Sequence, residues 1–260
     1  MQRFQNKVVL ITGSGSGLGR QAALRFSAEG AVIACADINE LGNLETQALV
    51  TEAGGRIYIG TAVDLTDEDA VRNWVESAAQ ELGAIDVVYA NAGATKFNPI
   101  TETSLDEWDW VLKHELDLVF LPVKHAWKHL QARGGSVVLV GSTAGISGSM
   151  TNTRIAHSAT KGGVIAMTRQ LAAEGALSGI RVNCVSPGMV RTPATEGDLL
   201  ADDHPMKNIE RAIPLQRIGT PTEVINCVLF LASDDASYVT GANLVVDGGW
   251  SAVLPGFGVV

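Results

Sequence analysis

Short apolar runs alternate with longer segments of helical length along this chain of 260 residues, and that rhythm restricts the folds open to it. Most runs are apolar at nearly every position, as is typical of parallel strands covered on both faces. The longer segments carry local boundary signals, such as Ser104 before one of them and Gly83 after another. The pattern therefore predicts an α/β fold, with a doubly wound, seven-stranded parallel sheet and helices on both faces.

No linker or repeat divides the chain, so residues 1–260 are predicted to form a single domain. The expected strands are Lys7–Thr12, Ala31–Ala36, Arg56–Val63, Ile85–Ala90, Ser136–Gly141, Ile180–Val185 and Asn243–Val246. The expected helices are Arg20–Glu29, Asn39–Ala53, Asp67–Leu82, Ser104–Arg133, Ala156–Leu177 and Thr222–Ala232.

Residues 189–215 break this rhythm, because they are rich in Pro, Asp and Thr and too long for a plain connection. Ligands bind beyond the carboxyl ends of the strands in such sheets, and this segment follows a strand end. We therefore expect it to act as a lid over a substrate, with a simple surface insertion as the alternative.

Charge, cysteine content and hydropathy exclude several classes of protein. With 19 basic and 28 acidic side chains the net charge is −9, which argues against a nucleic-acid surface. The odd, scattered cysteines, Cys35, Cys184 and Cys227, indicate reduced thiols in a cytoplasmic protein. No apolar run approaches the ~18 residues that span a bilayer, and the start of the sequence lacks a signal peptide. The histidines have no spacing typical of metal ligands, so no metal is expected.

A glycine-rich turn joins the first expected strand to the first expected helix, reading Thr12-Gly13-Ser14-Gly15-Ser16-Gly17-Leu18-Gly19. Such glycines let the backbone approach a pyrophosphate, which the amino end of the helix attracts. Asp37 ends the second strand, where a carboxylate accepts hydrogen bonds from the adenosine ribose and repels a 2′-phosphate. Neither Ser16 nor Ile38 supplies a base for that phosphate, so the sequence favours NAD over NADP. The alternative for Asp37 is a turn residue.

Two further strand ends are expected to border the same cleft. Asp64 and Leu65 follow the third strand and are predicted to contact the adenine amine. Asn91-Ala92-Gly93 follows the fourth strand, where small residues let the backbone pass close to the adenosine ribose. Each pair is also compatible with an ordinary turn.

These motifs make the chain resemble the short-chain dehydrogenase/reductase family, from Lys7 to Trp250. The resemblance rests on the glycine turn, Asn91-Ala92-Gly93, Ser142, Ser186-Pro187-Gly188, Thr192, and the closing Val239-Thr240-Gly241 and Asp247-Gly248-Gly249. It implies a Rossmann-like fold and a nicotinamide cofactor. The cofactor-binding residues so implied are Gly13, Ser16, Gly17, Leu18, Gly19, Asp37, Ile38, Asp64, Leu65, Asn91, Gly93, Lys161, Pro187, Gly188, Val190 and Thr192.

Two of the four catalytic positions of that family are altered here. Ser142 matches the serine that polarises the substrate carbonyl, and Lys161 matches the lysine that binds the nicotinamide ribose. His157 stands where the family has its acid/base tyrosine, and Glu115 stands where it has an asparagine that holds a relay water. The three tyrosines of the chain lie elsewhere, at positions 58, 89 and 238.

The altered positions remain compatible with acid/base chemistry. His157 and Lys161 are four residues apart, so both can face the cleft from one helix. A neighbouring ammonium favours the neutral form of an imidazole, which can take a proton from an alcohol. Glu115, if near, would orient one ring nitrogen or neutralise the lysine. An imidazole is shorter than a phenol by roughly 2 Å, so the substrate must sit deeper or a water must bridge.

The sequence therefore predicts an NAD-dependent oxidoreductase that interconverts a secondary alcohol and a ketone, with Ser142, His157, Lys161 and Glu115 as the catalytic residues. The alternatives are an NAD-binding protein without redox turnover, a lyase or isomerase, and an inactive or engineered form. The paired change at Glu115 favours a re-tuned site.

Substrate and assembly are implied mainly by the resemblance. Lys96, Arg154 and Arg191 fall in segments that border the substrate cleft in the family, and with Ser142 they suit a polar substrate such as a sugar acid or polyol. The alternative is that these cations are solvated loop residues. The family usually forms homotetramers through its two long helices, and apolar side chains abound in the first of these. The apolar tail Trp250–Val260 is expected to pack on something, such as a neighbouring subunit.

Overall fold

One continuous parallel sheet organises the molecule. The structure, a computed structural model, describes residues 2–60 and 62–253. The strands are β1 (Val8–Thr12), β2 (Val32–Ala36), β3 (Arg56–Gly60), β4 (Val87–Ala90), β5 (Gly135–Val140), β6 (Ile180–Pro187) and β7 (Asn243–Val246). They lie in the order β3-β2-β1-β4-β5-β6-β7, and every neighbouring pair is parallel. The predicted doubly wound α/β fold is confirmed.

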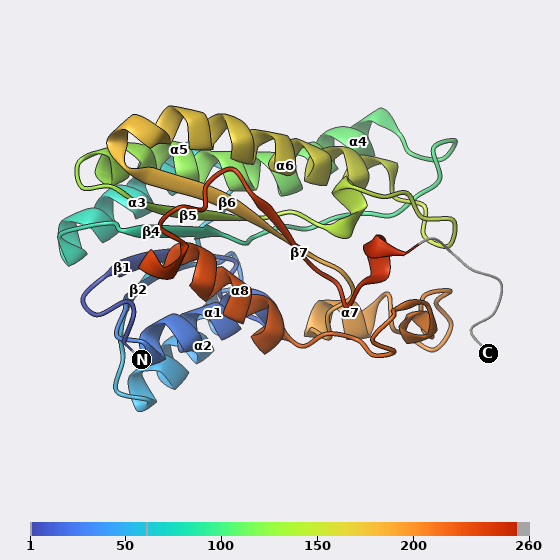
Figure 1. Ribbon diagram of the computed structural model, residues 1–260, viewed down its shortest axis with the longest axis horizontal. Helices are drawn as coiled ribbons and strands as arrows, with labels where there is room; N and C mark the ends of the chain where they lie inside the picture. The colour runs from blue at the N-terminus through green and yellow to red at the C-terminus, as the bar shows by residue number, and fades with distance from the viewer. Residues whose placement is uncertain (1, 61, 254–260) are drawn as a thin grey trace.

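Two layers of helices cover the sheet (Figure 1). The helices on one face are α3 (Glu68–Leu82), α4 (Leu105–Leu112), α5 (Leu118–Gln131) and α6 (Ile155–Gly175). Those on the other face are α1 (Gly17–Ala28), α2 (Glu40–Glu52) and α8 (Pro221–Ala232). Single turns complete the chain: η2 (Thr143–Gly145), η3 (Ala176–Ser178), η5 (Asp234–Ala236) and η6 (Trp250–Ala252).

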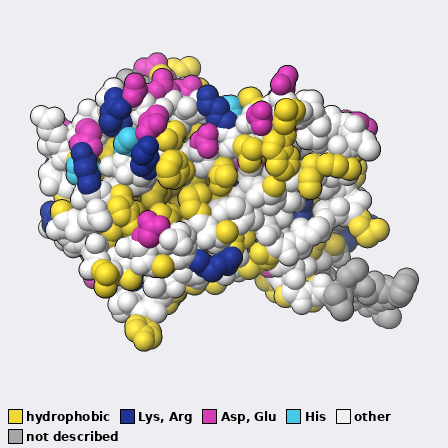
Figure 2. Space-filling view, turned by 90° about the horizontal axis from the view of Figure 1, so that it is seen from above, with side chains coloured by type: hydrophobic (Ala, Val, Ile, Leu, Met, Phe, Trp, Pro, Cys, Tyr) yellow, Lys and Arg dark blue, Asp and Glu magenta, His cyan; other side chains and the backbone are white. Residues whose placement is uncertain are grey.

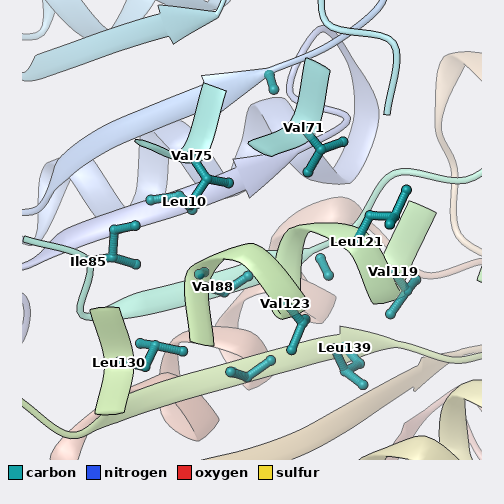
Figure 3. Packing of buried hydrophobic residues seen from close by; sticks show 14 of the residues in the cluster. Leu10, Val71, Val75, Ile85, Val88, Val119, Leu121, Val123, Leu130 and Leu139 are labelled. Atoms are coloured by element: carbon teal, nitrogen blue, oxygen red, sulfur yellow. The ribbon is translucent and has the colours of Figure 1, made fainter. Parts of the chain in front are cut away.

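Alternation along the strands builds a core on each face of the sheet. In β1, Leu10 packs with α3 and α5 on one face, whereas its neighbour Ile11 packs with α1 and α8 on the other. Figure 3 shows the first of these layers, in which Val75 and Val123 meet the strand residues. Because both faces are buried, each strand must be apolar at successive positions, and this explains the continuous apolar runs in the sequence.

The predicted helix Ser104–Arg133 is wrong in one respect, because it is interrupted. The helix α4 ends at Leu112, a π-helical turn η1 (Lys113–Asp117) follows, and α5 then starts at Leu118. A π turn inserts one extra residue into the helical repeat, so side chains beyond it are rotated relative to an unbroken α-helix. Glu115 lies in this turn and is only 3% exposed.

Strand ends differ slightly from the prediction. The third strand stops at Gly60 instead of Val63, and Ala62 has a left-handed backbone with φ of 43°, which is incompatible with a continuing strand. The strand β6 continues through Ser186 to Pro187, since its last residues still pair with β7.

Residues 189–215 form a compact excursion beyond β6. It contains the helix α7 (Pro193–Gly197), capped by Thr192, and the turn η4 (Ile209–Ala212). Met189, Met206 and Ile213 make a small cluster of their own, against which Trp250 packs. A bridge between Val190 and Gly219 joins the two ends of the excursion. The sequence predicts that the tail Trp250–Val260 packs on something, such as a neighbouring subunit. Residues 254–260 of this tail lie outside the residues that the structure describes.

Within the described part of the chain, no helix is long and apolar enough to cross a membrane. Nor do the described residues bring three or more potential metal ligands together. Cys35 and Cys184 are buried and Cys227 is half-buried, and all three are free thiols.

Candidate active site

The sequence-predicted site residues gather at one edge of the sheet. Because all seven strands are parallel, their carboxyl ends meet there. The glycine turn follows β1, Asp37 follows β2, and Asn91 follows β4. Ser142 follows β5, and Gly188 follows β6. This is the edge where ligands bind in doubly wound folds.

The glycine turn has the geometry of a dinucleotide-binding loop. Gly13 and Gly17 have φ angles of 68° and 51°, which only glycine adopts without strain. A Cβ on Gly19 would collide with the backbone carbonyl of Gly13, so the helix α1 can approach the turn only without a side chain there. The turn therefore leaves the first N–H groups of α1 directed to the space above the sheet.

Asn91 connects the end of β4 to that turn. Its Nδ2 donates to the carbonyl oxygens of Thr12 and Gly13, at 3.1 and 3.3 Å. The backbone N–H groups of Asn91 and Ala92 both donate to Thr12 Oγ1. The Asn91 side chain thus stabilises the turn through hydrogen bonds, a role that was not expected from the sequence.

Asp37 faces the same turn from the end of β2. Its Oδ2 accepts from the Gly15 N–H at 2.7 Å, and its Oδ1 accepts from the Asn39 N–H at 2.8 Å. Ser16 and Ile38 are exposed beside it. Arg20, on α1, already donates to Gly15 O, Gly42 O, Thr46 Oγ1 and Glu45. The end of β2 thus carries the negative charge of Asp37, and the side chains of Ser16 and Ile38 beside it are neutral.

His157 and Glu115 are in direct contact at the centre of the site. His157 lies in the first turn of α6, and its Nδ1 is 2.8 Å from Glu115 Oε1 and 2.9 Å from Oε2. The Oγ1 of Thr160, one turn further along α6, is 2.6 Å from Glu115 Oε2. Lys161 Nζ is 3.8 Å from Glu115 Oε1. One carboxylate therefore connects three side chains of the same helix.

The electrostatics of this cluster keep Glu115 ionised. Burial by itself would raise the pKa of the Glu115 carboxyl, but the hydrogen bond from His157 and the charge of Lys161 outweigh it and hold that pKa below its usual value of 4.5. A carboxylate can only accept hydrogen bonds, so the proton of the contact resides on His157 Nδ1. In the neutral form of the imidazole, this hydrogen bond leaves the lone pair on the second ring nitrogen, Nε2.

Lys161 and Ser142 complete the catalytic positions. Lys161 is buried and its Nζ donates to the carbonyl of Val140, the last residue of β5, at 3.2 Å. Ser142 follows two residues later, and its Oγ accepts from the Ala144 N–H at 3.1 Å. The structure thus brings His157, Lys161 and Glu115 together and places Ser142 at the adjacent strand end.

Three contributors to the site were not singled out in the sequence. The Phe97 ring stands edge-on to the His157 ring, with centroids 5.5 Å apart. Thr160 binds Glu115 as described, and the π turn η1 carries that glutamate. Only Thr160 gave a usable signal, because its spacing of three residues from His157 places both on one helix face.

The three cations expected at the substrate rim have different surroundings. Lys96 Nζ lies 4.5 Å above the ring of Trp110, and Arg191 pairs with Glu196 at 2.9 Å. Arg154, the N-cap residue of α6, is half-buried and makes a single 3.5 Å contact with the carbonyl of Ser147.

The chain has relatives of known class over nearly all of its length. Residues 13–251 match the family model described as Enoyl-(Acyl carrier protein) reductase. The chain belongs to the short-chain dehydrogenase/reductase family. It is 41% identical to 3-oxoacyl-[acyl-carrier-protein] reductase of Thermotoga maritima, covering 95% of this chain and 98% of that protein.

Two further comparisons support the same family membership. The chain is 39% identical to cis-4-hydroxycyclohexanecarboxylate dehydrogenase of Sinomonas cyclohexanicum, over 97% of this chain and 99% of that one. The crystal structure of levodione reductase superposes with a TM-score of 0.91 at 36% identity, over 96% of this chain and 100% of that one. The protein is thus a short-chain oxidoreductase of the class that acts on alcohols and ketones with NAD or NADP.

Proposed function

We propose that this dehydrogenase oxidises a polar secondary alcohol, such as a sugar acid or polyol, to a ketone with NAD, and that His157 is its acid/base. The observation that carries the proposal is the contact between His157 Nδ1 and the buried Glu115 carboxylate. That contact fixes the tautomer and leaves Nε2 able to accept a proton.

The residues present fit a nicotinamide dinucleotide. A Cβ on Gly19 would collide with Gly13, so the glycine there permits the tight turn of a dinucleotide-binding loop. Asp37 follows β2 and contacts this turn through Gly15, where its carboxylate would bind the adenosine ribose. Together with Ser16 and Ile38, the Asp37 carboxylate favours NAD, because it would repel a 2′-phosphate and no neighbouring base would neutralise one. When bound, the nicotinamide ring supplies the hydride acceptor, and Lys161 would hold the ribose next to it.

Each catalytic side chain has a separate task in the alcohol oxidation. The Ser142 hydroxyl donates a hydrogen bond to the substrate oxygen and keeps it near the imidazole. The O–H bond breaks with its proton going to His157 Nε2, while the C–H bond breaks with its electron pair leaving as hydride. The alcohol so loses two electrons and two hydrogens, and a ketone remains. Glu115 stabilises the imidazolium that forms, and Lys161 adds to the cofactor clamp.

Residues 1–260 act as one cofactor-binding and catalytic domain in this proposal, and residues 189–215 act as the substrate lid. Met206 of that segment is buried, and its sulfur accepts a hydrogen bond from Thr151 Oγ1 at 3.2 Å. Thr151 belongs to the stretch between Ser142 and His157. The excursion thus already contacts the wall of the cleft that carries the acid/base.

A homotetramer is the proposed assembly, with α5 and α6 in its interface. Phe120 on α5 is 46% exposed and Ile155 on α6 is 40% exposed. Figure 2, seen from the side of these helices, shows hydrophobic side chains gathered in one broad area among scattered charges. Such an area favours a second copy of the chain as its cover. Light scattering after gel filtration tests this, and a strict monomer would contradict it.

The function is tested by measuring NADH formation at about pH 7–9 from NAD and a panel of sugar acids, polyols and apolar secondary alcohols. We expect turnover within the first two classes and loss of at least roughly 100-fold in kcat on His157→Ala. The substitution His129→Ala, near the end of α5 where the ring contacts Glu76 of α3, serves as the matched control. Tight NADH binding with no turnover of any alcohol would overturn the proposal and favour a non-redox role.

A further inference from the structure

Arg154 is a half-buried cation whose hydrogen-bonding capacity is almost unused. Among the described residues its buried Nε has no hydrogen-bond partner, and its guanidinium makes one hydrogen bond, from Nη2 to the carbonyl of Ser147 at 3.5 Å. Among the described residues no carboxylate pairs with it. A guanidinium carries five N–H donors, so nearly all of the donors of Arg154 lack a hydrogen-bond acceptor among the described residues.

Arg181 shows how this protein treats a comparable arginine that has a purely structural role. Both guanidinium groups are about half-buried, and burial lowers the pKa of each. Arg181 donates to four backbone carbonyls at the end of α8 and before β7: Leu231, Ala232, Ser233 and Val239. Taking a charge out of water is unfavourable unless hydrogen bonds or an opposite charge replace the water. Arg181 has hydrogen bonds that replace the lost water, whereas Arg154 has only one among the described residues.

The other two cations of the expected rim already have partners. The Lys96 ammonium lies over the Trp110 ring, and the Arg191 guanidinium pairs with Glu196. Neither needs a ligand to balance its charge. Arg154 is therefore the one cation of the three, within the described residues, that lacks compensation.

Its position brings Arg154 next to the reacting groups. It is the N-cap residue of α6 and stands three residues before His157 in the sequence. Its contact with Ser147 places it against the segment that begins at Ser142. Arg154 thus lies between the segment that carries Ser142 and the first turn of α6, which carries His157.

We propose that Arg154 anchors an anionic group of the substrate, a carboxylate, while the reacting hydroxyl lies between Ser142 and His157. This rests on the proposed function and narrows its substrate class from polar alcohols to hydroxy acids. A carboxylate accepts two parallel N–H bonds from a guanidinium, and it would supply both the missing acceptors and the missing charge.

Matched pairs of alcohols with and without a carboxylate test the anchor. We compare D-gluconate with D-glucitol, and 3-hydroxybutyrate with butane-1,3-diol, in the wild type and in Arg154→Gln and Arg154→Lys. Charged hydrogen bonds support a rise of roughly 10- to 100-fold in KM for the acids on Arg154→Gln, with kcat changed less than about threefold. The KM for the neutral alcohols should rise less than the KM for the acids, and Arg154→Lys should retain part of the preference for acids. Arg133→Gln, at an exposed arginine after α5, is the matched control.

A second readout does not depend on turnover. Butyrate, which has no hydroxyl to oxidise, should bind the wild type in the presence of NADH, as measured by calorimetry, and more weakly at higher salt. Binding should be at least roughly 10-fold weaker in Arg154→Gln. Equal butyrate affinity in both proteins, or equal KM effects on acids and neutral alcohols, would overturn the anchor. Turnover of neutral alcohols in that case would leave the proposed function standing, whereas no turnover of any alcohol would overturn that function separately.

Discussion

The Nδ1 atom of His157 lies within 2.9 Å of both oxygens of Glu115, although 42 residues separate the two in the sequence. A phenol has a single oxygen both for proton transfer and for the hydrogen bond that orients it, whereas an imidazole has two separate nitrogens. In this chain one nitrogen contacts a buried carboxylate, and in the proposed mechanism the other nitrogen is left for substrate. The proposed catalytic centre is therefore arranged around a carboxylate–imidazole pair.

Replacing Glu115 by glutamine should lower activity strongly. The amide has nearly the same shape, but it carries no charge to stabilise the imidazolium, and its NH₂ group allows the wrong tautomer of His157. We expect kcat to fall by roughly 100- to 10,000-fold, with little change in NADH affinity. Glu81→Gln, at an exposed position on α3, is the control. Steady-state kinetics decide the matter, and a loss smaller than about threefold would be incompatible with the pair.

Thr160 acts as a positioning residue through Glu115. Thr160→Val removes the hydroxyl at 2.6 Å from Glu115 Oε2 but preserves the shape of the side chain. We expect kcat to drop by roughly 10-fold with KM nearly constant, and the acid limb of the pH profile to move. Thr160→Ser should restore most of the rate. Unchanged kcat in Thr160→Val, together with a lowered melting temperature, would indicate a structural role alone.

The ionisation of Glu115 should also appear in stability. Its pKa in the folded protein lies below 4.5, the value expected in the unfolded chain. The carboxylate therefore contributes stability that is fully present above about pH 4.5 and is lost as the pH falls through the folded pKa. Urea unfolding of the wild type and Glu115→Gln should give free energies that converge below about pH 4.5. A difference that stays constant across this range would contradict the depressed pKa.

Asp37 should control the choice of dinucleotide. In Asp37→Ser the charge that opposes a 2′-phosphate is removed, so we expect weaker NADH binding by roughly 10-fold and a smaller discrimination against NADPH. Adding Ile38→Arg should bring NADPH binding level with NADH or beyond it. Fluorescence titration of both reduced cofactors measures this. Tighter binding of NADPH than of NADH by the wild type would refute the role given to Asp37.

The two altered positions should be strongly coupled. His157→Tyr alone leaves the buried Glu115 carboxylate without its imidazole partner, and Glu115→Asn alone leaves the imidazole unsupported. We expect the double substitution to be more active than at least one of the singles, by about 10-fold or more in kcat. A double-mutant cycle on kcat/KM gives the coupling. Additive losses would show that the two positions act independently.

Local motifs made the backbone geometry of the proposed cofactor site predictable. In that proposal the glycine turn, Asp37 and Lys161 act through backbone conformation or through spacing along one helix, and both can be read from adjacent residues. The same reasoning located all seven strands, because burial on both faces leaves continuous apolar runs.

The contact between Glu115 and His157 could not be predicted from the sequence. The sequence indicates only what Glu115 would do if it lay near His157. Whether Glu115 reaches His157 depends on the π turn η1, which adds a residue within an otherwise regular helical pattern and has no distinct signature in the sequence. The contribution of Thr160 follows only once Glu115 has been placed. Likewise, the family resemblance marked Arg154 as a rim residue, but only the positions of the carboxylates in the described part of the chain show that none of them pairs with it.

The bridge at the ends of the excursion has a consequence for how substrate range changes among relatives. Gly219 N–H donates to Met189 O, and Arg191 N–H donates to Gly219 O, so both ends of the excursion are fixed to each other at one point. Its apolar residues pack mainly among themselves. We therefore expect that the part of the excursion after Thr192 can be exchanged as a block, by evolution or by a protein engineer, while the sheet, the dinucleotide site and the catalytic pair stay as they are.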